Sequence, residues 1–291
     1  MSVVASELHR FSDLETAPFN AKLYSAMKFG HSGVADSFGR MMAAKFASHR
    51  AGTLHSKQCV VIPAPSTMVP VAATLISRAF TNELNAIVDV LTRGQMTVEW
   101  TMIHRDMTYD NNYADLPKEQ RKVLLAGDAL HLNKDYVRGK HLIFVDDIRI
   151  TGSHEEKITD FMSAEGLGNT YEFVTFATYT GDDASIEHRL NHSFIRNAAD
   201  VVRMANTIGR EHVVTTRAIR ILLKSDTFDS DIAPANPRFI VESHEAAMVK
   251  GYNRVPELRE NYEKLRSTRM AISGSSIERM LGEMHCGMAL V

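Results

Sequence analysis

The sequence predicts an α/β protein built on a parallel sheet, with a helical region after it. Short apolar runs typical of buried strands alternate with helical patterns across residues 20–180, and this alternation favours a parallel sheet with right-handed crossovers. From about Ser185 onward the strand patterns fade, and apolar stripes at helical spacing replace them. We therefore expect an α/β domain over residues 1–190, including an N-terminal helical segment, and a helical C-terminal region over residues 191–291.

Each element follows from its apolar pattern. Apolar side chains at helical spacing predict a helix within residues 20–50. Runs rich in β-branched and aromatic residues predict strands at residues 59–62, 86–90, 98–103, 141–145 and 171–179. Patterns of helical period between them predict helices at residues 68–80, 118–126 and 155–164. Further along, the pattern predicts helices at 186–206, 211–224 and 255–270, a polar loop at 226–237 and a helix break at 273–276.

Composition narrows the class of protein. The chain has 291 residues, of which 44% are hydrophobic and 23% charged, as is ordinary for a globular protein. A net charge of −2 gives no general attraction to nucleic acid or to an anionic membrane. Cys59 and Cys286 lie far apart and indicate no disulfide framework. Residues 1–15 lack the apolar centre of a signal peptide, and no apolar run approaches membrane-spanning length, so we expect a cytoplasmic protein.

One segment carries most of the functional information. An apolar run at residues 141–145 ends in Asp146 and Asp147, and a Thr-Gly-Ser turn at residues 151–153 then leads into a predicted helix. Ligands of open α/β sheets bind outside the carboxyl ends of the strands. A turn at a helix N-terminus presents N–H groups that favour phosphate. The segment is therefore suited to a ligand with both hydroxyls and a phosphate, such as a phosphorylated sugar.

Residues 145–153 resemble the phosphoribosyl pyrophosphate (PRPP) motif of the type I phosphoribosyltransferases. The resemblance implies a parallel-sheet core of that type. It also implies that Asp146 and Asp147 contact the ribose 2- and 3-hydroxyls and a Mg²⁺ ion, and that the following loop holds the 5-phosphate. The residues it places around PRPP in this motif are Asp146, Asp147, Ile148, Arg149, Ile150, Thr151, Gly152, Ser153 and His154.

Three positions depart from the family pattern. Arg149 replaces a usual aliphatic residue, Ile150 replaces a usual Ser, Thr or Asp, and His154 stands where a Ser or Thr commonly closes the phosphate loop. Some family members use an acidic residue at the position of Ile150 as a base toward a purine, which an isoleucine cannot do. These departures keep open a second interpretation, a module that binds PRPP or a nucleotide without turnover.

Other classes of protein also carry adjacent acids after an apolar run. A Walker B strand requires a G-x-x-x-x-G-K-[ST] loop elsewhere in the chain, and the sequence has none. Receiver domains carry their acidic pair on the first strand, whereas this pair lies halfway along the chain. A strand end with solvated acids is the structural alternative. His188 and His192 have helical i, i+4 spacing, but no third metal ligand accompanies them.

A second candidate follows the first predicted strand, at Pro65, Ser66 and Thr67. In the resembled family this position carries the loop that contacts pyrophosphate, so the resemblance adds these residues to the PRPP site. Hydroxyls and N–H groups at a helix start can bind phosphate oxygens. The structural alternative is that Ser66 or Thr67 caps the next helix.

A third candidate is the polar stretch at residues 104–113, which is similar in position to the flexible loop that closes over PRPP in phosphoribosyltransferases. Closure would exclude water from a reactive sugar cation, and Arg105 would neutralise the departing pyrophosphate. A surface loop with a solvated Arg105–Asp106 pair is the alternative. Residues 24–30 also resemble the segment that precedes the first strand in competence-type members of the family.

Together these patterns predict a pentosyltransferase of nucleotide metabolism. It would transfer ribose 5-phosphate from PRPP to a nitrogen acceptor resembling a nucleobase, and release pyrophosphate. Arg105, Asp146 and Asp147 would carry catalysis, with Mg²⁺ held at Asp146 and Asp147 as the cofactor. The expected partners are PRPP and the acceptor. We expect no binding to nucleic acid or to membranes, and the sequence is compatible with a homodimer. No sequence motif identifies the acceptor.

Overall fold

Five parallel strands form the centre of the α/β part of the chain, in the order β1-β7-β6-β2-β3. The computed structural model describes residues 4–105 and 130–288. The strands are β1 Val4–Phe11, β2 Cys59–Pro63, β3 Val98–Trp100, β6 His141–Arg149 and β7 Tyr171–Tyr179. Strands alternate with helices, so the predicted α/β class with a parallel sheet is confirmed.

Helices cover the sheet because its central strands carry apolar residues on both faces. In β6, Ile143 and Val145 belong to one core cluster, and Leu142 and Phe144 to a second, as the two-residue period of a strand requires. Four helices contribute to the first cluster: α1 Ala21–Lys28, α2 Ser32–Ser56, α3 Ala72–Thr92 and α7 Ile186–Asn191. The second cluster receives Ile158 and Met162 from α6 Ser153–Ala164 and Val137 from α5 Lys134–Val137.

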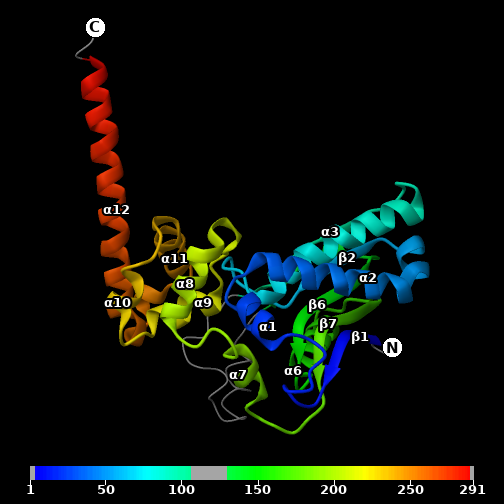
Figure 1. The fold of residues 1–291 in the computed structure, drawn as a ribbon. Helices are drawn as coiled ribbons and strands as arrows, with labels where there is room; N and C mark the ends of the chain where they lie inside the picture. The colour runs from blue at the N-terminus through cyan, green and yellow to red at the C-terminus, as the bar shows by residue number, and fades with distance from the viewer. Residues whose placement is uncertain (1–3, 106–129, 289–291) are drawn as a thin grey trace. The chain divides into compact units, whose positions relative to one another are not determined.

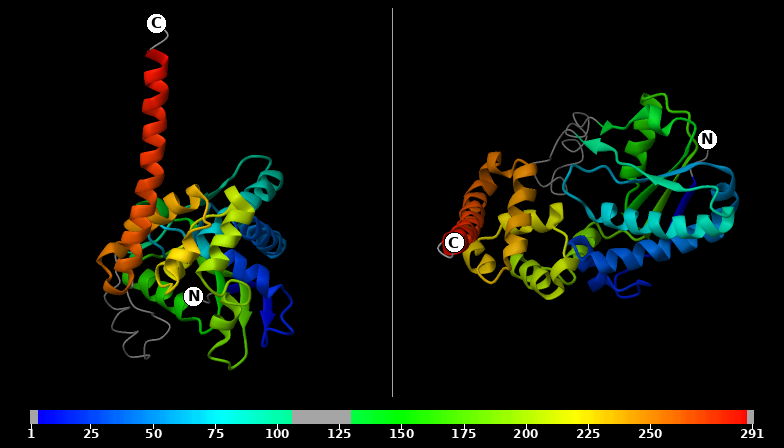
Figure 2. Two further views of the ribbon diagram at one scale, coloured as in Figure 1. Left: turned by 60° about the vertical axis from the view of Figure 1, so that its left-hand side comes forward. Right: turned by 90° about the horizontal axis from the view of Figure 1, so that it is seen from above.

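The helices α2 and α3 run side by side along the sheet (Figures 1 and 2). A Cβ atom added to Gly39 of α2 would lie 2.5 Å from the carbonyl oxygen of Ile76 and 2.7 Å from the Cβ of Ala79, both in α3. Glycine at this position therefore lets the two backbones approach closely. Phe38 stacks on Phe176 of β7, with ring centroids 4.1 Å apart, and so joins α2 to the sheet.

Several predicted elements differ from the observed ones. The predicted strand at residues 86–90 is wrong, because α3 continues to Thr92 and buries Leu84 and Val88 at helical spacing. The edge strand β1 was not predicted. The predicted helix at residues 20–50 is two helices, separated at Gly30, whose φ is 110°. Short antiparallel strands β4 His104–Arg105 and β5 Leu130–His131 pair with each other. The predicted helix at 118–126 lies outside the described residues.

The chain divides into two compact units, Met1–Ile195 and Arg196–Val291. The first holds the sheet and ends with α7 Ile186–Asn191. The second is helical, as predicted. Its elements are α8 Ala198–Ile208, the 3-10 turn η2 Gly209–Glu211, α9 Thr216–Leu223, α10 Phe228–Ile232, α11 Pro237–Val249, the 3-10 turn η3 Tyr252–Arg254 and α12 Pro256–Met288 (Figure 1).

Two predictions fail within the second unit. The segment expected to be a polar loop at 226–237 contains α10, in which Phe228 and Ile232 are buried at i, i+4 spacing. The break expected at 273–276 is absent from the described backbone of α12, because Gly and Ser lower helix propensity without forbidding a helix. Among the described helices, none has the length and hydropathy that crossing a membrane requires.

Candidate functional site

The two predicted ligand-binding turns lie next to each other at the carboxyl edge of the sheet. The strands β2 and β6 are neighbours, paired as far as Pro63 opposite Val145. The Ala64 amide then donates to the Val145 carbonyl over 3.0 Å. The turn at residues 64–67 therefore begins beside the acidic pair that follows Val145, at the sheet edge where α/β proteins bind ligands.

The Asp147 carboxylate is buried and paired with α1. Lys28 forms an ion pair with its Oδ2, and the Tyr24 hydroxyl donates to the same oxygen over 2.5 Å. The three residues are at most 9% exposed. Burial by itself raises the pKa of a carboxyl, but the ammonium and hydroxyl outweigh it and bring the pKa of Asp147 to about 2. Burial, with the Asp147 charge beside it, raises the pKa of Tyr24. The carboxylate is therefore ionised and the phenol is neutral.

Asp146 has a different environment. Strand geometry turns neighbouring side chains in opposite directions, and its Oδ2 lies 3.0 Å from Nδ1 of His154 in α6. Its side chain is 19% exposed and the His154 side chain 61% exposed. Burial raises the pKa of Asp146, while the bond from His154 lowers it in part. Asp146 is thus the more accessible of the two acids.

The predicted phosphate loop directly precedes α6. Gly152 is the N-cap residue of α6, with φ 75° and ψ 4°, which glycine adopts without steric cost. The exposed hydroxyls of Thr151 and Ser153 hydrogen-bond to each other. The first-turn N–H groups of α6 have no partners within the helix. Hydroxyls and N–H donors thus gather at one helix start.

Arg149 lies against this loop. Its Nε is 3.2 Å from Oε2 of Glu155, in the first turn of α6. A Cβ atom placed on Gly152 would meet its Nη2 at 3.5 Å and its Nε at 3.6 Å. Burial raises the pKa of Glu155, and the guanidinium partly opposes that shift. By contrast, Ile148 and Ile150 are partly buried and pack against the core, so only their backbones are suited to contact a polar ligand.

The turn at Pro65, Ser66 and Thr67 has a buried hydroxyl. Ser66 is 4% exposed, and its Oγ has no hydrogen-bond partner in the described structure; such groups are rare unless a ligand or water completes them. The helix-cap alternative for Ser66 and Thr67 is wrong, because α3 begins only at Ala72. Ser66 also forms a β-bridge with His104. The base of the third candidate segment therefore lies beside this turn.

Arg105 ends the described part of that segment, as the second residue of β4. Its backbone pairs with Leu130 of β5. The placement of its side chain, and residues 106–113 of the predicted closing loop, lie outside what the structure describes. The role proposed for Arg105 therefore stays a prediction.

The oxygen donors of Asp146 and Asp147 can be compared with the ligands that Mg²⁺ prefers. Mg²⁺ prefers oxygen ligands and is usually held by one or two carboxylates together with substrate phosphates. Asp146 fits this pattern as a partly exposed carboxylate, whereas Lys28 already engages an oxygen of Asp147. Within the described residues, no three His, Cys, Asp or Glu side chains gather into a metal-binding group. The donors therefore suit a cation shared with a bound ligand.

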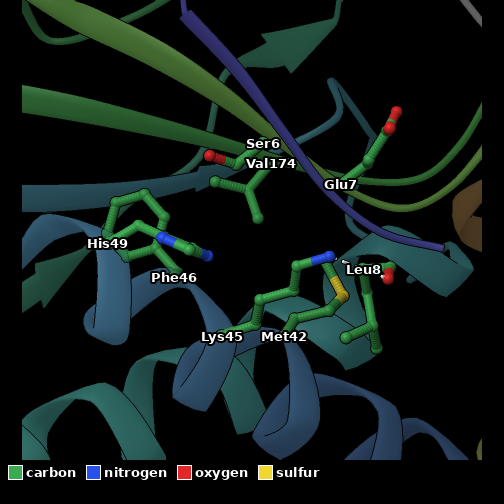
Figure 3. Close-up of a pocket in the computed structure, with 8 residues that line it drawn as sticks. All are labelled: Ser6, Glu7, Leu8, Met42, Lys45, Phe46, His49 and Val174. Atoms are coloured by element: carbon green, nitrogen blue, oxygen red, sulfur yellow. Dashed lines mark hydrogen bonds between the residues drawn. The ribbon is translucent and has the colours of Figure 1, made fainter.

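Two hollows elsewhere on the α/β unit hold none of the candidate residues. One, of about 140 Å³, is lined by residues of β1, β7 and α2, including Leu8, Phe46 and Val174 (Figure 3). Lys45 crosses it and donates to the Leu8 carbonyl over 3.1 Å. The other is bounded by the turn after α5 and by residues 165–169. Neither contains a residue of the PRPP-type motif.

Sequence reasoning missed three residues that contact this site: Tyr24, Lys28 and Glu155. The first two belong to the segment at residues 24–30 that was noted for its resemblance alone. Their link to Asp147 spans 123 and 119 residues of sequence, so no local pattern shows it. Glu155 lies in the first turn of the helix that follows the loop, so the sequence does contain an acid close to the end of β6.

The chain is similar to one family model and, at low identity, to solved structures. The family model described as PRTase ComF-like matches residues 3–265. No curated protein matches the chain. Solved structures similar to it include a hypoxanthine phosphoribosyltransferase of Staphylococcus aureus, 10% identical, covering 51% of this chain and 76% of that one at a TM-score of 0.28. Another, from Trypanosoma cruzi and complexed with the product IMP, is 12% identical and covers 53% and 80% at a TM-score of 0.31.

Proposed function

The chain belongs to the PRTase ComF-like family, and from this premise we propose that it transfers ribose 5-phosphate from PRPP to a nitrogen acceptor and releases pyrophosphate. The family supports phosphoribosyl transfer in general. A small, base-like acceptor of nucleotide metabolism is the finer part of the proposal.

One observation carries the proposal. An acidic pair, a phosphate-type loop and a second polar turn converge at the carboxyl edge of the two neighbouring strands β2 and β6. The loop offers Gly152 in a left-handed conformation at the start of a 12-residue helix. The second turn offers the buried, unpartnered hydroxyl of Ser66. This arrangement supports neighbouring sites for a phosphate, for sugar hydroxyls and for a further phosphate group.

The division of roles follows from charge and exposure. The loop at residues 151–154 would hold the 5-phosphate, and the acids would orient the ribose hydroxyls with Mg²⁺. Ser66 and its turn would receive pyrophosphate, and Arg105 would offset the charge on that leaving group. When bound, Mg²⁺ would supply further charge stabilisation at the pyrophosphate. In the transition state the bond between ribose C1 and pyrophosphate is largely broken, so catalysis needs mainly positioning and charge stabilisation. The lack of an acidic side chain at position 150 therefore does not exclude turnover.

A sensing module on the same fold is the second candidate, favoured by Arg149, Ile150 and His154 in the motif. Incubating the full chain with PRPP, Mg²⁺ and a panel of nitrogen bases separates the two. We expect pyrophosphate release that depends on one acceptor, with a ribosylated product found by mass spectrometry. Tight PRPP binding without pyrophosphate release across the panel would favour the sensor. Failure to bind PRPP would overturn the transferase proposal and the PRPP sensor, and would leave only a module that binds a nucleotide.

A further inference from the structure

The geometry points to Arg149 as a recognition residue for the 5-phosphate of the ligand, with Glu155 as the residue that positions it. This inference rests on the proposed function, because it assumes that the loop at residues 151–154 receives a sugar phosphate. Arg149 occupies a position where the resembled motif has an aliphatic residue. An extra cation beside the loop is therefore a feature of this chain.

The first argument is the position of the guanidinium. A Cβ on Gly152 would lie 3.5 Å from Nη2 and 3.6 Å from Nε of Arg149, so the cation packs on the glycine at the helix start. A phosphate held by the N–H groups of that helix start lies within reach of the same side chain. The Arg149 side chain is 40% exposed and open to a ligand from solvent.

The second argument is the way in which the side chain is held. Glu155 engages Nε at 3.2 Å, and the four remaining N–H donors of a guanidinium lie on its two terminal nitrogens, in the fork that matches a phosphate. The Glu155 carboxylate is only 17% exposed, and its Oε1 is buried with no hydrogen-bond partner in the described structure. Its other oxygen, Oε2, contacts Arg149. This contact fixes one edge of the guanidinium, so we assign Glu155 a positioning role.

The third argument is the charge that surrounds the loop. Asp146, Glu155 and Glu156 all lie at this end of β6 and α6, and a phosphate would meet these carboxylates at short range. His154 already bonds to Asp146. Arg149 is the permanently charged cation placed to offset them, since a guanidinium keeps its charge at any physiological pH. Without it, the uncharged donors of the loop and helix start would have to attract the anion against these carboxylates.

The test compares two ligands that would each occupy a different part of the PRPP site. Ribose 5-phosphate and pyrophosphate are each titrated into the full chain by calorimetry in the presence of Mg²⁺. Arg149→Leu should weaken ribose 5-phosphate binding about tenfold to a hundredfold, the range for one hydrogen-bonded charge, and leave pyrophosphate binding unchanged. Arg149→Lys should lose less. The matched control is Arg40→Leu, which breaks the ion pairs of Arg40 with Asp36 and Glu83 in the same unit and should change neither affinity.

Glu155→Gln separates positioning from packing. Alone it should weaken ribose 5-phosphate binding, but in the Arg149→Leu background it should have no further effect, because its action passes through the guanidinium. Equal, additive losses in both backgrounds would overturn the positioning role. Unchanged ribose 5-phosphate affinity in Arg149→Leu would overturn the recognition role, and if that variant fails to fold, the same result in Arg149→Gln decides. If the wild-type chain binds pyrophosphate but not ribose 5-phosphate, the proposed function itself fails.

Discussion

Asp146 and Asp147 are neighbours in the chain, yet their carboxylates are stabilised differently. Asp147 is held by Lys28 and Tyr24 of α1, and its pKa is lowered to about 2. A lowered folded-state pKa contributes stability that is fully present above the unfolded pKa near 4 and is lost as pH falls toward 2. The pair thus stabilises the junction of α1 and β6 throughout the neutral range.

Removing the cation should reverse this pH dependence. In Lys28→Met the buried Asp147 carboxylate loses its partner, so we expect a loss of about 3–5 kcal/mol in the free energy of unfolding at pH 7. Burial then raises the pKa of Asp147, and part of the stability should return as pH falls toward 5. Chemical denaturation at pH 7.5 and 5.5 measures this. Asp147→Asn should show no such recovery, and an equal pH response in both variants would contradict the pairing.

Asp146 is the acid better placed to meet a ligand. Asp146→Asn keeps the shape of the side chain and removes one charge-assisted acceptor, so PRPP binding with Mg²⁺ should weaken by about 1.5–3 kcal/mol. The protein should lose little stability, because the side chain is partly exposed. Calorimetry checks the affinity, and thermal unfolding is the control. An unchanged dissociation constant would remove Asp146 from the site.

A substitution at Gly152 tests whether the loop at residues 151–154 binds phosphate. At φ 75° a β-branched side chain is strained, and its Cβ would contact the Arg149 guanidinium. Gly152→Val should therefore abolish ribose 5-phosphate binding while circular dichroism shows the helices intact. Normal binding by the folded variant would make the loop structural only. Gly139 also has a positive φ, of 74°, but nothing lies within 4 Å of an added Cβ, so Gly139→Val serves as the matched control for strain alone.

At the scale of elements, the packing of α2 on α3 depends on Gly39. A methyl group there would overlap the Ile76 carbonyl and the Ala79 side chain, at 2.5 and 2.7 Å. Gly39→Ala should cost about 1–3 kcal/mol in stability, because the helices must separate to admit it. Gly52, in the same helix, has nothing within 4 Å, so Gly52→Ala should be neutral or stabilising. Urea unfolding of both variants measures the difference, and equal stabilities would contradict the close approach.

The sequence predicted most elements of the sheet, and the exceptions have physical causes. The run at residues 171–179 became β7 with the expected bounds, because a β-rich stretch buried on both faces is unambiguous. Residues 86–90 are also rich in β-branched residues, but they lie in a helix because their spacing continues the buried stripe of α3. The edge strand β1 has no continuous apolar run, because polar residues interrupt its apolar ones, and it pairs with β7 along its length. Local pattern cannot show such pairing.

The candidate site divides in the same way. The strand, the acids and the loop are consecutive in the chain, so a local motif predicts their arrangement; the structure places them at the carboxyl edge, with β6 extended to Arg149. The partners of the acids were not predictable. Tyr24 and Lys28 reach Asp147 only because α1 packs against the sheet. The orphaned Ser66 hydroxyl is likewise a consequence of burial, which a sequence motif does not contain.

At the scale of the whole molecule, the family match extends to residue 265 and so includes most of the helical second unit. The sequence motifs alone covered only about residues 24–180. The family model therefore includes residues 196–265 of the helical unit as well as the α/β unit. A motif search could not show this, because the unit contains amphipathic helices and no residues with a recognisable chemical signature.

Once an acceptor is found, Arg105 tests how the chain would stabilise the departing pyrophosphate. If its charge acts on pyrophosphate as that group departs, its interaction is stronger in the transition state than in the bound ground state. Arg105→Ala should then lower kcat at least tenfold while the Kd for PRPP changes less than threefold. Calorimetry for affinity and a pyrophosphate-release assay with the accepted base measure the two quantities. Arg138→Ala, which removes an exposed cation with a local partner, is the control. Equal losses in affinity and turnover would make Arg105 a ground-state binding residue, and the leaving group would then have to be stabilised by Mg²⁺ and the turn at Ser66.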